Sequence, residues 1–243
     1  MNKLILVMSL ALLVVSGFST QAQQLPTKSK EAIFTTAIGS NEFSTAFAYQ
    51  HLWLVGKKRK LGLGAGIRLT NYFGFNKYFT TAPAELTSGK TGPGVFFSEN
   101  IEENIDSVLF KNAQVNSLNL SINIQYAFSK KFAAGFNIDA IGFSFGGQKD
   151  ATYFGNNGTG GATSAKPTGF NLLLISDNDK GSLNSEFYGK YMFNNKWAAK
   201  LGYQFLFVEY TTDTKVQTTP DGQTNDRFRN KSSGILLGVT RSF

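Results

Sequence analysis

Between residues 118 and 145, apolar and polar side chains alternate on both sides of a short polar turn at residues 129–131. Before the turn, one face is apolar and the other is rich in small polar residues. The apolar face holds Leu118, Leu120, Ile122, Ile124, Tyr126 and Phe128, and the polar face holds Asn119, Ser121, Asn123 and Gln125. A period of two predicts a β-hairpin. The pattern alone does not say whether the apolar face forms a core or meets lipid.

Similar hairpins recur along the chain. "YAFSKKFAAGFNI" (126–138) and "YMFNNKWAAKLGY" (191–203) share Tyr-x-Phe, a polar turn containing Lys, an aromatic residue and then Ala-Ala. "HLWLVGKKRKLGLGAGI" (51–67) is a looser relative with an alternating segment after its turn. The recurrence predicts three hairpins of one architecture, each closed by a short polar turn.

Alternation predicts eight strands in all. They are expected at about 31–39, 42–55, 61–74, 114–128, 132–146, 183–193, 197–210 and 231–243. An even number with both termini at the short-turn end is typical of closed single-chain barrels. Residues 107–110 and 169–175 are also apolar enough to extend strands or to add a pair, so eight or ten strands are possible.

Three long polar connections separate the hairpins, at about 75–113, 147–182 and 211–229. The segment 154–169, "FGNNGTGGATSAKPTG", has the composition of a loop. Connections this long are uncommon inside compact soluble domains. Long loops at one end and short turns at the other are typical of membrane β-barrels.

Three features favour an outward apolar face. The polar face is rich in Gly, Ala, Ser and Asn, which fit a narrow lumen. Aromatic residues gather beside the turns, as in the girdles that mark a bilayer interface. Isolated charges on the polar face are expected to pair across the lumen, and they are Arg68, Asp139, Glu186, Lys190 and Lys200. The alternative, a lipocalin-like soluble barrel with an apolar interior, would usually carry a packed helix, and the chain shows no helical period of useful length.

One stretch conflicts with strict alternation. Phe143 and Phe145 share the parity of Asn137 and Asp139. The apolar stripe must therefore end there, or a bulge must shift the register before Gly146.

The ends of the chain and its charge indicate its compartment. Lys3, the apolar run 4–15 and a small-residue site ending at Ala22 predict a signal peptide over 1–22, a short lead over 23–30 and a barrel domain over 31–243. The formal charge is +8, and +7 without Lys3. The chain has no cysteine. Basic residues cluster in turns rather than on a helix or groove, so nucleic acid is not an expected partner, whereas basic turns near a membrane contact anionic lipid.

The C-terminal segment "GILLGVTRSF" carries a family resemblance. With its terminal Phe243, and Gly238 five residues earlier, the chain resembles the small porin-like outer-membrane β-barrel proteins of Gram-negative bacteria. Arg241 departs from the pattern, because the family usually has an apolar residue there. The resemblance implies an all-β, up-and-down transmembrane barrel of about eight strands in the cell outer membrane after export. It also implies outer-membrane lipid and lipopolysaccharide as partners, together with the assembly machinery that reads the last strand.

Few residues are candidates for chemistry. His51 is the only histidine. Lipid-modifying barrel enzymes use a serine with a histidine base, but no serine stands near His51 in the sequence. We therefore interpret His51 as an interfacial aromatic residue beside Tyr49 and Trp53. Glu99, Glu102, Glu103 and Asp106, and the segment 177–186, have oxygen ligands for Ca²⁺. In the segment 177–186 the Gly and Glu fall at the wrong offsets for an EF-hand calcium loop. We interpret both segments as solvated acidic loops. No catalytic, cofactor-binding or metal residue is assigned, no cofactor is expected, and no enzymatic activity is expected.

The interior of an eight-stranded barrel is about filled by side chains, so the sequence predicts no large aqueous pore. Three functions remain open at this point. They are a structural or surface-interaction protein that binds an extracellular partner through its long loops, a small-solute porin or channel, and a lipid-modifying outer-membrane enzyme that uses His51.

Overall fold

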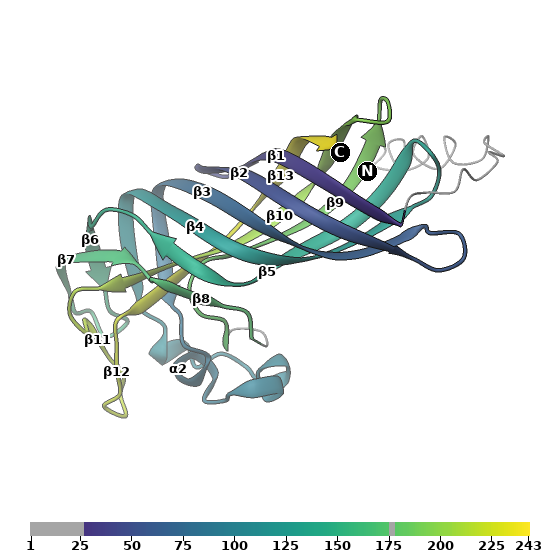
Figure 1. The fold of residues 1–243 in the computed structure, drawn as a ribbon. Coiled ribbons are helices and arrows are strands. Elements are labelled where there is room, and N and C mark those ends of the chain that lie inside the picture. Colours follow the sequence, from purple (N-terminus) through teal and green to yellow (C-terminus); the bar gives the residue numbers. More distant parts are fainter. Residues whose placement is uncertain (1–26, 175–177) are drawn as a thin grey trace, which may run out of the picture.

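The alternating segments form eight long antiparallel strands that close into a ring (Figure 1). The computed structural model describes residues 27–174 and 178–243. The ring consists, in order, of β1 (Lys28–Gly39), β2 (Glu42–Val55), β3 (Leu61–Thr81), β4 (Ser107–Ala127), β5 (Phe132–Phe145), β9 (Leu183–Met192), β10 (Trp197–Thr212) and β13 (Arg227–Ser242). Pairing of β13 with β1, from Glu31↔Ser242 to Ile38↔Ile235, closes the ring and leaves no edge strand.

The predicted fold class is confirmed, with eight strands in the ring rather than ten. The expected signal peptide lies outside the described residues. The strand β1 begins at Lys28, inside the segment expected to be a short lead. The segment at 107–110 lengthens β4, and residues 170–172 form only the short strand β8 (Phe170–Leu172), which pairs with β5.

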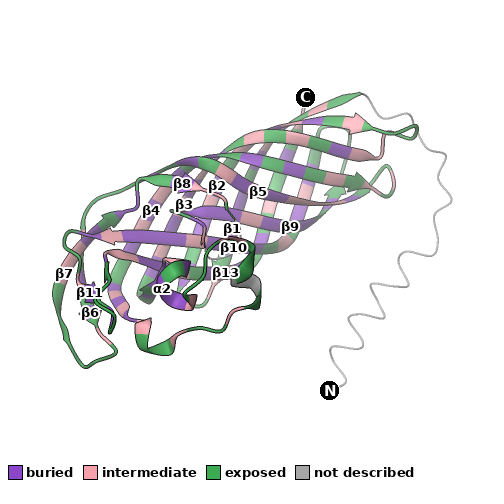
Figure 2. Ribbon diagram, turned by 90° about the horizontal axis from the view of Figure 1, so that it is seen from below, coloured by how far each residue is buried: buried purple, intermediate pink, exposed green. Residues whose placement is uncertain are grey.

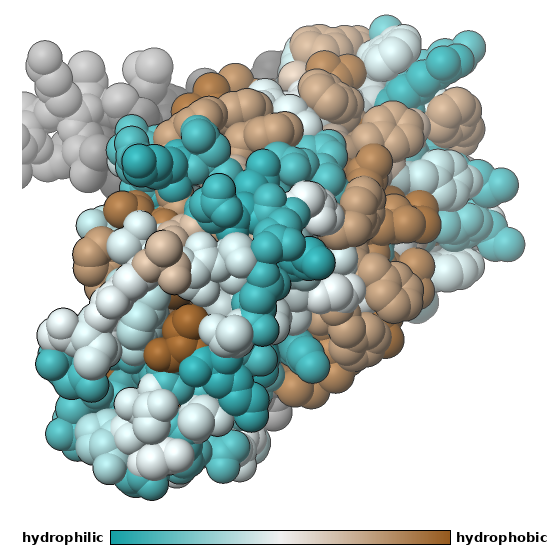
Figure 3. All heavy atoms as spheres, turned by 90° about the vertical axis from the view of Figure 1, so that its left-hand side faces the viewer, coloured by the Kyte–Doolittle hydropathy of each residue, from teal (hydrophilic) through white to brown (hydrophobic). Residues whose placement is uncertain are grey.

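The apolar face of the barrel wall points outward and the polar face points into the lumen, as the positions of the aromatic and small residues predicted. Along the 118–124 segment, Leu120 and Ile122 are 56% and 51% exposed, whereas Asn119 is 1% exposed. The same alternation of buried and exposed positions runs along the strands of the ring (Figure 2). A space-filling view shows an apolar belt over the barrel wall and a hydrophilic surface over the loop end, which lies in the lower part of this picture (Figure 3). The soluble, lipocalin-like alternative is therefore wrong for this part of the molecule.

A bulge in β5 resolves the conflict at Phe143 and Phe145. The β4–β5 register changes between Leu120↔Ile141 and Ser121↔Asp139, which leaves Ala140 without a partner. The extra residue turns the strand by one position. Phe143 and Phe145 thus face outward, at 63% and 52% exposed, while Asp139 stays inside.

The strands β3 and β4 are longer than predicted. In both strands the positions that face inward switch from one alternate set to the other at the same level, so the two strands stay paired beyond the point where the alternation breaks. The inward pairs are Gly74↔Ala113 on one side of the change and Phe79↔Val108 on the other. Between them Asn76 has a positive φ of 50°, a conformation that Asn tolerates better than most residues. The strands continue through this irregularity to Thr81 and from Ser107.

Beyond this level the wall closes a second time with fewer strands. The hairpin β1–β2 has ended, and β13 pairs directly with β3 at Phe228↔Thr81 and Arg229↔Thr80. The hairpin β6 (Lys149–Phe154) and β7 (Gly160–Pro167) bridges β4 to β10. A ring of six strands results at the loop end of the barrel, consisting of β13, β3, β4, β6, β7 and β10. We call it the upper ring, and we use "above" for the direction toward the loops. The expectation that 154–169 is wholly loop is wrong, because its second half is β7.

The remaining elements lie at the loop end (Figure 1). They are the helix α2 (Ala84–Ser88), the 3-10 turns η1 (Gly92–Phe97) and η2 (Glu102–Asn104), and a two-stranded hairpin of β11 (Gln217–Thr218) and β12 (Thr224–Asn225). Within the described residues, no helix has the length and apolar character needed to cross a bilayer.

Candidate functional site: a filled lumen beneath the upper ring

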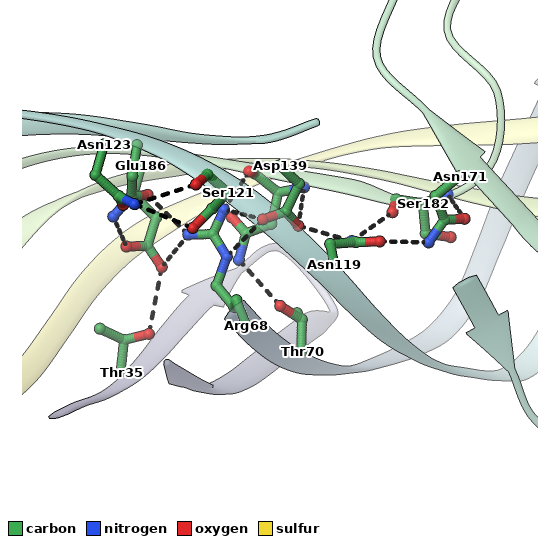
Figure 4. Close-up of polar contacts among 12 residues, drawn as sticks. Thr35, Arg68, Thr70, Asn119, Ser121, Asn123, Asp139, Asn171, Ser182 and Glu186 are labelled. Carbon is green, nitrogen blue, oxygen red and sulfur yellow. Dashed lines mark hydrogen bonds and ion pairs between the residues drawn. The ribbon is translucent and has the colours of Figure 1, made fainter. Parts of the chain in front are cut away.

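Arg68 of β3 lies at the centre of the lumen (Figure 4). Its Nε donates to Asp139 Oδ1 at 2.9 Å, and its Nη1 donates to Asn137 Oδ1 at 2.7 Å. The same carboxylate accepts hydrogen bonds at its Oδ2 from Asn119 Nδ2 at 2.8 Å and from the Asn184 backbone N–H at 3.0 Å. Donors from β3, β4 and β9 therefore satisfy one buried carboxylate on β5.

Glu186 of β9 lies beside this group and has partners on β10, β3 and β1. Lys200 Nζ is 2.5 Å from Glu186 Oε2, and Arg68 Nη1 is 3.4 Å from Oε1. Thr35 donates to the same carboxylate at 3.3 Å. The ammonium of Lys200 also lies 3.8 Å from the centroid of the Tyr188 ring, which is a favourable cation–π distance.

A second buried pair lies nearer the short turns. Lys190 Nζ is 2.7 Å and 2.9 Å from the two carboxylate oxygens of Glu31, and Gln50 Nε2 donates to Glu31 at 2.8 Å. All three side chains are at most 5% exposed. The five charged residues expected to meet in the lumen therefore do so, and Glu31, which the sequence reading missed, completes the set. The signal for Glu31 was its position on the polar face of β1.

Small residues let the strands approach closely around this network. A Cβ added to Gly202 of β10 would lie 2.0 Å from the Phe187 carbonyl oxygen on β9. Such crowding explains why Gly stands at this position of the polar face. Arg68, Lys200 and Gln50 are among the largest fully buried side chains of the chain, so the lower lumen is occupied by protein atoms.

Above the polar network, the interior of the upper ring is apolar. Phe79, Phe110 and Tyr210 form an aromatic triangle, with the rings of Phe110 and Tyr210 stacked at 4.3 Å and Phe79 at 5.0 and 5.4 Å from them. Other members of this core are Tyr72, Val108, Ala113, Val115, Ala151, Tyr153, Ala165, Leu206, Val208 and Phe228. The arrangement is that of a soluble β-barrel, with apolar residues inside.

Asp106 belongs to this upper part and is not solvated as expected. It is 6% exposed, and it accepts hydrogen bonds from the Tyr153 hydroxyl and from the Asn156 backbone N–H, the latter at 2.7 Å. Burial raises the pKa of Tyr153 to about 12, and the hydrogen bond to the Asp106 carboxylate is the second cause of this rise. Glu102 and Glu103 are exposed, as the solvated interpretation requires. The cluster of four carboxylates is thus split by the fold.

The second acidic segment is also more buried than expected. Asp177 lies outside the described residues. Asp179 is 5% exposed and accepts from the Leu174 backbone N–H at 2.6 Å. Its backbone carbonyl accepts from Arg227 at 3.4 Å and also from Arg229. The described residues contain no group of three or more histidine, cysteine or acidic residues placed to hold a metal ion.

An ion cluster that the sequence reading missed holds this segment to the wall. Glu209 of β10 is fully buried and lies 2.8 Å from Arg227 Nε and 2.8 Å from Arg229 Nη2. Its own backbone N–H donates to Ser182 Oγ at 3.2 Å. Arg229 also lies 5.3 Å from the Phe207 ring. Residues 211–229 read as loop from sequence, and so the pairing of β13 with β10 at this level could not be anticipated.

His51 lies on the outer face of β2, where the ring centroid is 4.7 Å from that of Trp53. Its neighbours in register are Lys30 on β1 and Ala65 on β3. Its Nε2 has no hydrogen-bond partner among the described residues. This geometry fits an interfacial aromatic residue, and no serine hydroxyl of the described residues is hydrogen-bonded to Nε2.

A closed eight-stranded ring with an apolar exterior and buried ion pairs inside is an integral membrane β-barrel. No protein-family model and no curated protein matches the sequence. Solved structures of similar shape include neisserial surface protein A (9% identity, TM-score 0.36, covering 89% of this chain and 96% of that one). They also include the attachment invasion locus protein Ail of Yersinia pestis (8% identity, TM-score 0.37, covering 90% of this chain and 100% of that one). A third is a major outer membrane protein of Thermus thermophilus (12% identity, TM-score 0.35, covering 88% of this chain and 99% of that one).

These three proteins are outer-membrane β-barrels, the class that the sequence resembles. At such identities and TM-scores, the likeness concerns the fold alone. The assignment of lipid-facing and lumen-facing sides rests on the burial and ion pairs of this chain.

Proposed function

We propose that this protein is an outer-membrane β-barrel that passes no solute and serves a structural or surface-interaction role through its extracellular loops. The observation that carries the proposal is the continuation of β3 and β4, each 21 residues long, into an upper ring with an apolar core. A tilted strand needs only about 9–11 residues to cross a bilayer. The excess length is a rigid, water-exposed structure built above the membrane.

The interior supports the closed state of the barrel at two levels. The lower lumen is occupied by paired charges. Opening it would separate pairs such as Arg68 and Asp139, in which both side chains are buried. The upper ring is occupied by stacked aromatic rings. A solute would have to disrupt a buried ion network and then an apolar core.

The upper ring also gives the loops a fixed platform. The segment 82–106 hangs from the β3–β4 end, where Ala82 N–H donates to the Arg227 carbonyl at 3.0 Å and Thr81 N–H donates to the Asp106 carbonyl at 3.1 Å. The β11–β12 hairpin is tied to the same region because Gln217 Nε2 donates to the Asn104 carbonyl at 2.7 Å. Loops that are fixed to one another present a defined surface to a partner outside the cell.

In this orientation the short turns lie in the periplasm, the loops lie outside the cell, and residues 1–22 are a removed signal peptide. The partners are outer-membrane lipid, lipopolysaccharide and the assembly machinery, together with an extracellular partner bound by the loops. His51 has an interfacial role, and the protein has no enzymatic activity.

Conductance in planar bilayers tests the closed lumen. The purified, folded protein is expected to give no discrete current steps, because side chains fill both levels of its interior. A general porin measured in the same bilayers shows that steps would be detected. Reproducible steps from this protein would contradict the proposal and support the channel function instead.

A further inference from the structure

The short-turn end of the barrel carries a ring of cations that we call the basic rim. Its members come from the β2–β3, β4–β5 and β9–β10 turns and from the paired ends of β1 and β13. They are Lys28, Lys30, Lys57, Lys58, Arg59, Lys60, Lys130, Lys131, Lys196 and Arg241. Most of these side chains are exposed, and Arg59 and Lys60 are half-buried.

No exposed acidic side chain lies among the described residues of this end. Glu31 is the one acidic side chain near this end among the described residues, and it points into the lumen and is paired with Lys190. In the rest of the chain, counting Glu31 and leaving out Lys3, acidic residues outnumber basic ones by 16 to 13. The net positive charge of the exported protein is therefore located at the basic rim.

Exposed aromatic side chains lie immediately beside these cations. Trp53 is in register with Lys28, and Trp197 is in register with Arg241. The Arg241 guanidinium lies 5.7 Å from the centroid of the Trp197 ring and 5.2 Å from that of Phe243. Tryptophan at the edge of an apolar belt marks the depth of the lipid headgroups, so the cations lie at headgroup level.

We propose that the basic rim binds the phosphate headgroups of anionic phospholipids in the leaflet that the short turns contact. The cations are spread around the whole circumference and adjoin the aromatic belt, which matches an annulus of lipid. A docked acidic protein would require one contiguous patch. This inference rests on the proposed membrane-barrel function, and it adds a lipid selectivity that a filled, inert barrel does not need.

Fluorescence quenching by brominated lipids tests the proposal, because the only two tryptophans of the chain, Trp53 and Trp197, both lie at the rim. The full-length folded protein is reconstituted into phosphatidylcholine vesicles that contain a fixed fraction of either brominated phosphatidylglycerol or brominated phosphatidylcholine. Near an anionic surface each basic group contributes roughly a fivefold preference. We expect brominated phosphatidylglycerol to show at least about fivefold tighter association, weakening as salt rises.

Two matched quadruple variants assign the effect to the rim. Replacing Lys57, Lys58, Lys130 and Lys131 with Gln is expected to lower the preference toward that of phosphatidylcholine. Replacing the exposed loop-end residues Lys90, Lys111, Lys166 and Lys215 with Gln is expected to leave it unchanged.

The outcomes separate this inference from the proposed function. Equal quenching by the two brominated lipids at low salt would overturn the lipid assignment, leave the rim to a soluble polyanion and leave the membrane barrel intact. Absence of quenching by both lipids would show that the tryptophans do not reach lipid, and would contradict the membrane barrel itself.

Discussion

Asp139 illustrates how the barrel holds a charge away from water. Its two oxygens accept from Arg68, Asn119 and the backbone of Asn184, which come from three different strands. The planar guanidinium of Arg68 also reaches Asn137, which a lysine ammonium could not do with the same geometry. Asp139 and Arg68 are thus both paired and hydrogen-bonded, as burial of a charge in a low-dielectric interior requires.

Removing one partner of this pair is expected to destabilise the barrel strongly. Asp139→Ala leaves the buried cations Arg68 and Lys200 to share the single carboxylate of Glu186. Breaking a buried pair in this way costs about 3–5 kcal/mol. The measurement is urea unfolding of the folded protein in lipid vesicles, followed by tryptophan fluorescence. The control, Asp150→Ala, removes an exposed carboxylate from β6 and should leave the midpoint unchanged. An unchanged midpoint for Asp139→Ala would mean that the pair does not stabilise the fold.

The sequence predicts which charges enter the lumen better than it predicts their partners. Lys200 is recognisable because it is an isolated charge beside Ala198 and Gly202, and Glu186 because it alternates with the apolar residues of β9. Which cation meets which carboxylate depends on the stagger of the whole ring, and no local pattern encodes that stagger. Asp106 and Asp179 lie in acidic segments of long polar connections, which predicts solvation, but hydrogen bonds from Tyr153 and from backbone N–H groups hold them in buried positions.

At the scale of elements, alternation locates strands until their parity changes. The bulge at Ala140 was predictable because Phe143 and Phe145 conflict with the stripe before them. The change at Asn76 was not, because Asn76 and Lys77 interrupt the alternation and the two aromatic residues that follow them are adjacent in sequence. The β6–β7 hairpin was likewise hidden, since its short strands carry Gly, Ala and Thr and lack a regular apolar face.

The eight-stranded ring should fold without the β6–β7 hairpin. All eight of its pairings, including β13 with β1, lie outside residues 149–167. Replacing 149–167 with a Gly-Ser linker removes two strands of the upper ring and exposes Phe110 and Tyr210 to water. The variant is expected to remain a folded barrel on a gel and to bind more of an apolar dye such as ANS than the parent protein. Loss of the folded barrel would show that the two rings form one cooperative unit.

At the scale of the whole molecule, the chain inverts its polarity along the barrel axis. In the lower part Leu120 faces outward and Asn119 faces inward, whereas in the upper part Phe110 and Val208 face inward. The solvent explains the inversion, since lipid surrounds the lower wall and water surrounds the upper one. A single wall of strands therefore serves as a membrane barrel below and a soluble barrel above.

Heat-dependent mobility on a denaturing gel shows whether the apolar face of the lower wall meets lipid. The purified protein, folded in detergent, is run with and without boiling. A closed membrane barrel resists the gel detergent until it is heated, so we predict two clearly different mobilities. A single mobility in both lanes, from a protein that also stays soluble without detergent, would contradict the account.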